Sequence, residues 1–208
     1  MLAGHYSAAL LTKAAAPRAP FWALVLGAQF IDVLWALFVL GGIERLRIDA
    51  SLPSNPLDLY HMPYTHSLLG ALFWAGVAFA GARFAWRSNG VAAALAVVVA
   101  SHWLLDLLVH RPDLPLWPGS AKLGLGIWNY PVPALLLELA LLLGSAWVLA
   151  SRVPWRRGLW IFAGSLAAIQ VAVTVGPPPL GPAGVALTAL VLFVGAVFAA
   201  SRIEARAG

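Results

Sequence analysis

The sequence predicts an all-α, polytopic integral membrane protein with about six transmembrane helices, preceded by a short N-terminal helix that enters the membrane only part-way. Of the 208 residues, 62% are hydrophobic and 10% are charged, whereas a soluble domain carries roughly 25% charged residues. The mean hydropathy of +0.86 would leave large apolar patches on a soluble protein. Several apolar runs are about 20 residues long, the length that a helix needs to cross the hydrocarbon core. These observations argue against a soluble enzyme, a nucleic-acid-binding protein and a disordered chain.

The first element is the short helix expected within residues 1–16. This stretch is apolar, and Pro17 and Pro20 separate it from the next run. The charge of Lys13 follows the apolar stretch, whereas the charge of a signal peptide precedes its apolar region. We therefore expect a helix that remains part of the folded protein.

The remaining elements are six membrane spans that follow one another along the chain. They are expected at Phe21 to Gly42, Thr65 to Trp86, Gly90 to His110, Val132 to Ala150, Gly158 to Gly176 and Gly181 to Ala200. The last two spans hold no ionisable side chain. We expect residues 1–150 to form the helical core, and residues 151–208 to form a transmembrane hairpin that supports it within the same domain.

Lysine and arginine residues divide unequally between the two sets of helix ends. One set holds nine, namely Lys13, Arg18, Arg83, Arg87, Arg152, Arg156, Arg157, Arg202 and Arg206. The other set holds four, Arg45, Arg47, Arg111 and Lys122, which are offset by Glu44, Asp49, Asp58 and Asp113. Because cytoplasmic loops carry the excess of these residues, we expect the first set in the cytoplasm and loops 43–64 and 111–131 outside. The excess thus indicates orientation, and no nucleic-acid partner is expected.

Ionisable side chains within or beside the spans are the main indication of function. A charged group at the centre of a membrane helix costs about 2.5–3.5 kcal/mol on insertion scales, so each one needs a reason. Four lie inside spans, namely Asp32, His102, Asp106 and Glu138. The five histidines include four more positions, His5, His61, His66 and His110, which lie in the short first helix or near the ends of spans. Since the chain has no cysteine, any metal must be held by nitrogen and oxygen atoms.

These side chains are expected at similar depths. At a rise of about 1.5 Å per residue, Asp32 and His102 lie roughly 18 Å from the cytoplasmic ends of their helices, and His5 and Glu138 roughly 20 Å. His66 lies nearer the outer rim. Any one of them alone is explained equally well as a hydrogen bond between helices. Their common depth favours a shared metal or proton site in the outer third of the membrane.

The spacing of His102 and Asp106 supports a metal site. Residues four apart on a helix project from one face, as two ligands of one centre must. His110 continues this series, although its face has rotated by roughly 80° and the helix is ending there.

Two blocks of sequence carry a family resemblance. Residues 61–69, HMPYTHSLL, resemble the H-x-x-aromatic-T-H-S-L-L signature of the bacterial YdjM-like membrane-bound metal-dependent hydrolases. Residues 101–106, SHWLLD, and 115–118, PLWP, resemble that family's second block. Gly4-His5 resembles its G-H start, and Asp32 falls at its acidic motif, which is reduced here to Phe30-Ile31-Asp32-Val33. The resemblance covers residues 4–118.

The resemblance implies a multi-pass protein of the bacterial inner membrane with a metal-dependent hydrolase site near the non-cytoplasmic side. The family is similar to zinc-dependent phospholipase C and P1-type nucleases, which cleave phosphate esters with a cluster of zinc ions. The expected ligands are His5, Asp32, His66, His102 and Asp106, with His61, His110 or Glu138 completing the coordination.

The expected cofactor is one or two divalent ions, with zinc preferred and manganese or iron also suited to imidazole and carboxylate. Either Asp32 or Asp106 would bridge two ions, and a water molecule that also bridges the ions would attack the substrate. Asp106 and Glu138 are the expected catalytic residues, with Glu138 accepting the proton of the water. Arg111 would bind a phosphate. Membrane lipids surround such a site, so we expect a lipid or lipid-linked phosphate ester as its substrate.

Two alternatives come from other functional classes. A metal-ion or proton transporter would also carry buried histidines and carboxylates, but it should show a polar path to the cytoplasmic side. The inner halves of the spans offer only Gln29, Ser145 and Gln170 for such a path. A haem protein would need facing histidines such as His5 and His102, and it would show a Soret absorption band.

Overall fold

The computed structural model describes residues 1–205 and confirms the all-α membrane fold class. Six of its helices are long and apolar enough to cross a membrane, and a shorter helix precedes them as expected. The helices are α1 (Tyr6–Ala15), α2 (Phe21–Leu40), α3 (Leu68–Trp86), α4 (Asn89–Val109), α5 (Pro131–Ala150), α6 (Arg156–Val175) and α7 (Pro182–Ala205).

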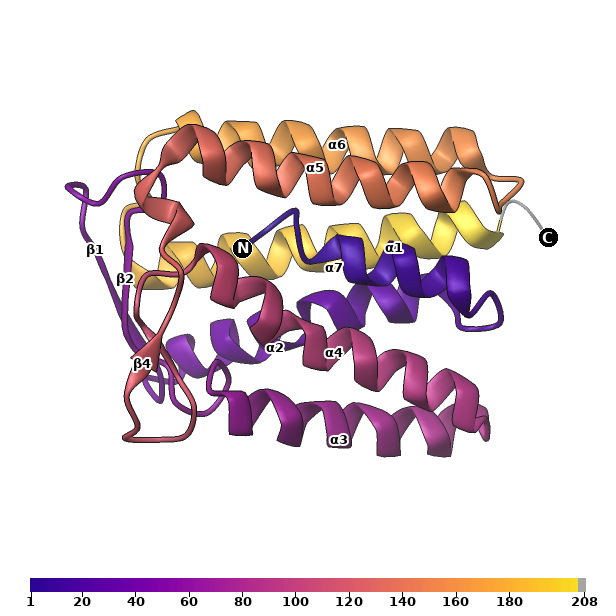
Figure 1. Cartoon of the computed structure of the whole chain (residues 1–208), viewed down its shortest axis with the longest axis horizontal. Coiled ribbons are helices and arrows are strands. Elements are labelled where there is room, and N and C mark those ends of the chain that lie inside the picture. Colours follow the sequence, from indigo (N-terminus) through magenta and orange to yellow (C-terminus); the bar gives the residue numbers. More distant parts are fainter. Residues whose placement is uncertain (206–208) are drawn as a thin grey trace.

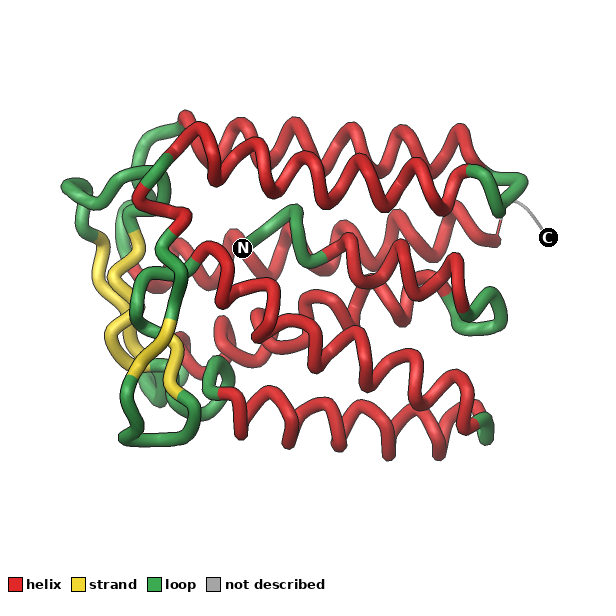
Figure 2. Tube along the Cα trace, in the orientation of Figure 1, coloured by secondary structure: helices red, strands yellow, loops and turns green. Residues whose placement is uncertain are grey.

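The long helices run side by side, and the strands gather at one end of the bundle (Figures 1 and 2). We call this end the hairpin end and the opposite one the basic end. Helix α2 packs against α4 and α7, α3 packs along α4, and α1 lies against α2 and α5. The start of α1 therefore lies inside the bundle, between spans that are distant in sequence.

Two small antiparallel sheets occupy the loops of the hairpin end. They pair β1 (Arg45–Ile48) with β2 (Leu57–His61), and β3 (Leu114–Pro115) with β4 (Lys122–Leu123), and a short 3-10 helix follows at Ile127–Asn129. Leu46 and Leu59 are buried in the same apolar cluster as Ile31 and Trp35 of α2. The first sheet thus packs onto the end of the helix that carries Asp32.

The buried apolar side chains form two clusters, one in each half of the bundle. The cluster at the basic end includes Leu10, Leu24, Val98, Leu142 and Leu159, which are fully buried. The second cluster lies toward the hairpin end and contains Ile31, Trp35, Val99 and Trp103. Most of the buried histidines and carboxylates lie on the segments that carry this second cluster.

The two C-terminal helices pack on different neighbours. Helix α6 packs mainly on α5, and α7 mainly along α2. Near the end of α7, Glu204 accepts hydrogen bonds from the Lys13 ammonium at 2.5 Å and from the Phe21 backbone N–H at 2.8 Å. The segment expected as a supporting hairpin is therefore joined to the turn between α1 and α2. Its last residues, 206–208, with Arg206, lie outside the described residues.

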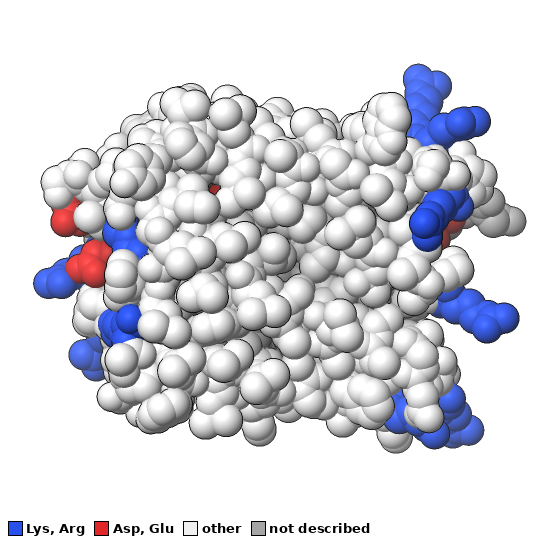
Figure 3. Space-filling view, in the orientation of Figure 1, with Lys and Arg blue, Asp and Glu red and all other residues white. Residues whose placement is uncertain are grey.

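On the face drawn in Figure 3, the middle of the molecule is almost free of charged atoms. Lys and Arg side chains predominate at the basic end, and both signs of charge appear at the hairpin end. This distribution, with the six apolar helices, is that of a multi-pass membrane protein.

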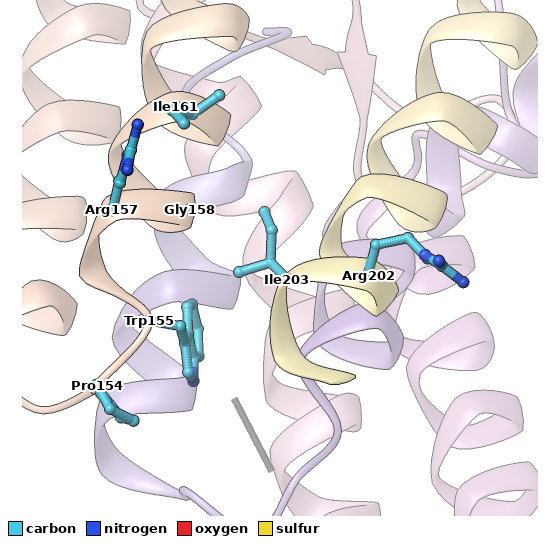
Figure 4. Close-up of a pocket in the computed structure, with 7 residues that line it drawn as sticks. All are labelled: Pro154, Trp155, Arg157, Gly158, Ile161, Arg202 and Ile203. Carbon is cyan, nitrogen blue, oxygen red and sulfur yellow. The ribbon is translucent and has the colours of Figure 1, made fainter. Parts of the chain in front are cut away.

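One pocket lies at the basic end, between the start of α6 and the end of α7 (Figure 4). Its volume is about 570 Å³, and its lining includes Trp155, Arg157, Arg202 and Ile203. Trp and Arg at helix ends are typical of the membrane interface. This pocket lies at the opposite end of the bundle from the buried histidines.

Candidate metal centre

Six ionisable side chains from four segments meet in the hairpin half of the bundle. Five are at most 5% exposed, and the side chain of Asp32 is 16% exposed. They are His5 just before α1, Asp32 in α2, His66 just before α3, His102 and Asp106 in α4, and His110 at the end of α4. Five of them form two groups that could hold a metal ion, one of His5, Asp32 and His102 and the other of His66, His102 and Asp106.

Four of these residues bring their ligand atoms close together in four histidine–aspartate pairs. His66 Nε2 lies 3.2 Å from Asp32 Oδ1 and 3.6 Å from Asp106 Oδ2. His102 Nε2 lies 3.2 Å from Asp106 Oδ2 and 3.6 Å from Asp32 Oδ1. Four ligands about 2.0–2.1 Å from a zinc ion would be about 3.3–3.4 Å from one another in a regular tetrahedron. We call these four residues the four-ligand set.

The other oxygen of Asp106 faces a second group of side chains. Its Oδ1 lies 3.0 Å from His5 Nε2 and 3.3 Å from His110 Nε2. The amino nitrogen of Met1 contacts the same oxygen. Asp106 therefore joins the four-ligand set to His5 and His110, one carboxylate oxygen on each side.

In His102 and His110, the ring nitrogen that does not face Asp106, Nδ1, contacts another acceptor. His102 Nδ1 lies 3.0 Å from the carbonyl oxygen of Ala28, and His110 Nδ1 lies 2.8 Å from Asp113 Oδ1. Since a carbonyl can only accept, His102 must donate from Nδ1, and its neutral ring then presents the lone pair of Nε2 to the carboxylates. Metal-ligating histidines almost always show such a contact at the other ring nitrogen.

Two buried atoms of the four-ligand set have no hydrogen-bond partner among the described residues. They are His102 Nε2 and Asp106 Oδ2. Leaving a buried polar group unsatisfied costs about 1–3 kcal/mol. A cation between these atoms would satisfy both, because each presents a lone pair to it.

Glu138 is buried but has a different environment from the cluster. Its Oε2 accepts hydrogen bonds from the backbone N–H groups of Leu2 at 2.8 Å and Gly4 at 3.3 Å. The carboxylate thereby fixes the segment that leads into His5. These contacts connect Glu138 to the backbone just before His5, and its expected role as proton acceptor stays a prediction.

Arg111 lies beyond the end of α4, among the loops of the hairpin end. Its guanidinium donates to Asn129 Oδ1 at 3.0 Å and to the carbonyl oxygen of Pro53 at 2.6 Å. Partial burial lowers the pKa of this guanidinium from its ordinary value. The contact with Pro53 joins loop 111–131 to loop 43–64, whereas the contact with Asn129 lies within loop 111–131.

His61 is brought to the surface. It is exposed at the end of β2, where it pairs with Arg45 of β1. Its ring centroid lies 6.5 Å from that of Tyr64. Among residues 1–205, no ion pair or hydrogen bond joins its ring to the cluster.

In the sequence, Glu44 and Asp113 stand out only as acids in the loops, where they offset arginines. The structure buries Glu44 to 1% exposure and bonds Asp113 to His110. For Asp113, its position three residues after a histidine at a helix end was a usable signal. For Glu44, whose partner Thr65 lies 21 residues away, the sequence offered none.

Comparisons with protein-family models, with curated proteins and with solved structures found no match to this chain. Its function must therefore be inferred from the residues of the cluster and their surroundings.

Proposed function

We propose that the protein is a membrane-embedded, metal-dependent hydrolase that cleaves a phosphate ester of a lipid or lipid-linked substrate. The four-ligand set supports this proposal most strongly, because two imidazole nitrogens and two carboxylate oxygens lie 3.2–3.6 Å apart in four pairs. Such a donor set suits zinc first, and manganese or iron also. His5 and His110 would serve a second ion on the other oxygen of Asp106.

The residues of the cluster would have different roles in such a reaction. When bound, a divalent ion would supply Lewis-acid activation of a water molecule and of a phosphoryl oxygen. Asp32 is the most exposed member of the cluster, so water and substrate would reach the site on its side. Its second oxygen, Oδ2, is not one of the four ligand atoms and would accept the proton that the water loses. Glu138 would act by holding the segment that carries His5.

A hydrophobic groove at the same end of the bundle as the cluster supports a lipid substrate. It has a volume of about 580 Å³ and lies between α2 and α3 at the hairpin end. Its walls include Phe38, Tyr64, Ser67 and Trp74, and Tyr64 and Ser67 lie on either side of His66 in the sequence. An alkyl chain in this groove would hold its phosphate group near the cluster.

We place the protein in the bacterial inner membrane, as the family resemblance implies, and the charge distribution supports an orientation with the cluster toward the non-cytoplasmic side. The basic end carries the excess of arginines, which in membrane proteins marks the cytoplasmic face. The hairpin end, with the cluster beneath it, would then face outward.

The apolar core favours hydrolysis over transport. Leu10, Leu24, Val98 and Leu142 are fully buried in the half of the bundle below the cluster. A transporter would need a polar path through that half, because an ion requires ligands or water at each depth.

The proposal is tested by assaying phosphate release from purified protein loaded with zinc, manganese or iron. We expect release from long-chain phosphatidic acid in mixed micelles, and slower release from glycerol 3-phosphate, which has no alkyl chain. Substituting His102→Ala should lower the rate by more than about 100-fold. Removing a residue that only hydrogen-bonds to a metal ligand already lowers metal affinity or activity by about 10–100-fold. His61→Ala, which removes an exposed histidine, should leave the rate unchanged.

Absence of release from any of these phosphate esters by all three metal-loaded forms would contradict the proposed reaction. Equal rates for wild type and His102→Ala would contradict the assignment of the site.

A further inference from the structure

Glu44 is a buried carboxylate that lies outside the metal cluster and connects to it through one residue. It precedes β1 and is 1% exposed. Its Oε1 accepts hydrogen bonds from the backbone N–H groups of Tyr64 at 2.8 Å and Thr65 at 2.9 Å. Its Oε2 lies 2.6 Å from the hydroxyl of Thr65. The same hydroxyl lies 2.8 Å from His66 Nδ1.

Glu44, Thr65 and His66 form a series of hydrogen bonds, and the direction of each bond follows from the carboxylate of Glu44. A carboxylate can only accept, and a threonine hydroxyl has a single hydrogen to give. Thr65 therefore donates to Glu44, and the oxygen of Thr65 must accept from its other partner. That partner is His66 Nδ1, which thus carries a hydrogen.

The hydrogen on Nδ1 decides what the other nitrogen of His66 can do. A neutral imidazole carries one N–H, so the lone pair lies on Nε2. This is the atom that lies 3.2 Å from Asp32 Oδ1 and 3.6 Å from Asp106 Oδ2. A histidine with the hydrogen on Nε2 would present N–H to the cluster and could not bind a cation there.

We propose that Glu44 is a positioning residue that acts through Thr65 to keep His66 in the tautomer that binds metal. This inference rests on the proposed metal site. His102 and His110 have acceptors directly at Nδ1. At His66 the neighbour is a hydroxyl, which can donate or accept, so a second residue must fix its direction.

The substitution Glu44→Gln reverses this direction while keeping the shape of the side chain. The amide oxygen can still accept from the backbone of Tyr64 and Thr65. The amide nitrogen then faces the hydroxyl of Thr65 and donates to it. The hydroxyl turns its hydrogen toward His66 Nδ1, and the ring is left with its hydrogen on Nε2.

The experiment measures zinc affinity by competition with a chelator in the purified, detergent-solubilised full chain. We expect Glu44→Gln and Thr65→Val to weaken zinc binding by about 10–100-fold, the range found for outer partners of metal ligands. Thr65→Ser keeps the hydroxyl and should bind zinc like the wild type. Glu204→Gln is the matched control, because Glu204 also accepts a backbone N–H but lies at the basic end.

A second measurement separates this role from a general effect on folding. In the zinc-loaded wild type with ¹⁵N-labelled histidine, NMR should show His66 bound through Nε2 with a proton on Nδ1. Binding through Nδ1, or a Nδ1 without its proton, would overturn the inference even if every variant were destabilised.

The outcomes also distinguish this inference from the proposed metal site. If Glu44→Gln and Thr65→Val bind zinc as tightly as wild type while His66→Ala does not, the metal site stands and the role of Glu44 is wrong. If the wild type itself binds no zinc, the metal site fails and the role of Glu44 fails with it.

Discussion

Replacing Asp106 by asparagine is expected to remove metal binding and to destabilise the fold more than any other single change in the cluster. The carboxylate is fully buried, and four histidines and the amino group of Met1 surround its two oxygens. An asparagine keeps the volume but removes the negative charge and one acceptor. Breaking a buried charge interaction by removing one partner costs about 3–5 kcal/mol.

The effect of Asp106→Asn is measured as metal content after purification and as the melting temperature of the metal-free protein. Asp58→Asn is the control, since Asp58 is a partly exposed aspartate that pairs with Arg47 on the surface of the first sheet. We expect the control to change neither quantity appreciably, because surface ion pairs contribute about 0–1 kcal/mol. A metal content equal to wild type in Asp106→Asn would contradict the bridging role of this residue.

Removing the metal from the wild type is expected to lower its melting temperature. A ligand that binds only the folded state stabilises it by about 2.7 kcal/mol when present at 100 times its dissociation constant. The change should be seen as a fall in melting temperature on adding a chelator, and as its recovery on adding zinc.

The variants His66→Ala and His61→Ala make this prediction specific to the four-ligand set. His66 is buried against both aspartates, whereas His61 is exposed on β2. His66→Ala should melt at the same temperature with and without zinc, and His61→Ala should respond like the wild type. A zinc response that survives in His66→Ala and disappears in His61→Ala would reverse the assignment.

Hydropathy alone predicted the membrane helices, because each must present about 20 apolar residues to lipid. The span expected at residues 21–42 is α2 at Phe21–Leu40, and that expected at 132–150 is α5 at Pro131–Ala150. The strands β1 and β2 were not predicted. The signal for β1 was the alternation of Arg45, Leu46, Arg47 and Ile48, in which Leu46 is buried and the arginines are exposed.

Depth along each helix predicted which residues could meet, but it could not predict which atoms face one another. The spacing of His102 and Asp106 fixes their contact, because it is set within one helix. The contacts of Asp32 with His66 and His102 depend on how α2 is rotated against α4, which hydropathy does not determine. The partners of Glu138 could not be predicted from depth either, because its hydrogen-bond donors are the backbone N–H groups of Leu2 and Gly4.

We expect a divalent cation to bind between His66, His102, Asp32 and Asp106. Anomalous diffraction at the zinc edge, from crystals of the zinc-loaded protein, tests it most directly. We expect an anomalous peak about 2.0–2.1 Å from Nε2 of both histidines and from one oxygen of each aspartate. A peak at another place only, or no peak in this part of the bundle, would contradict the claim.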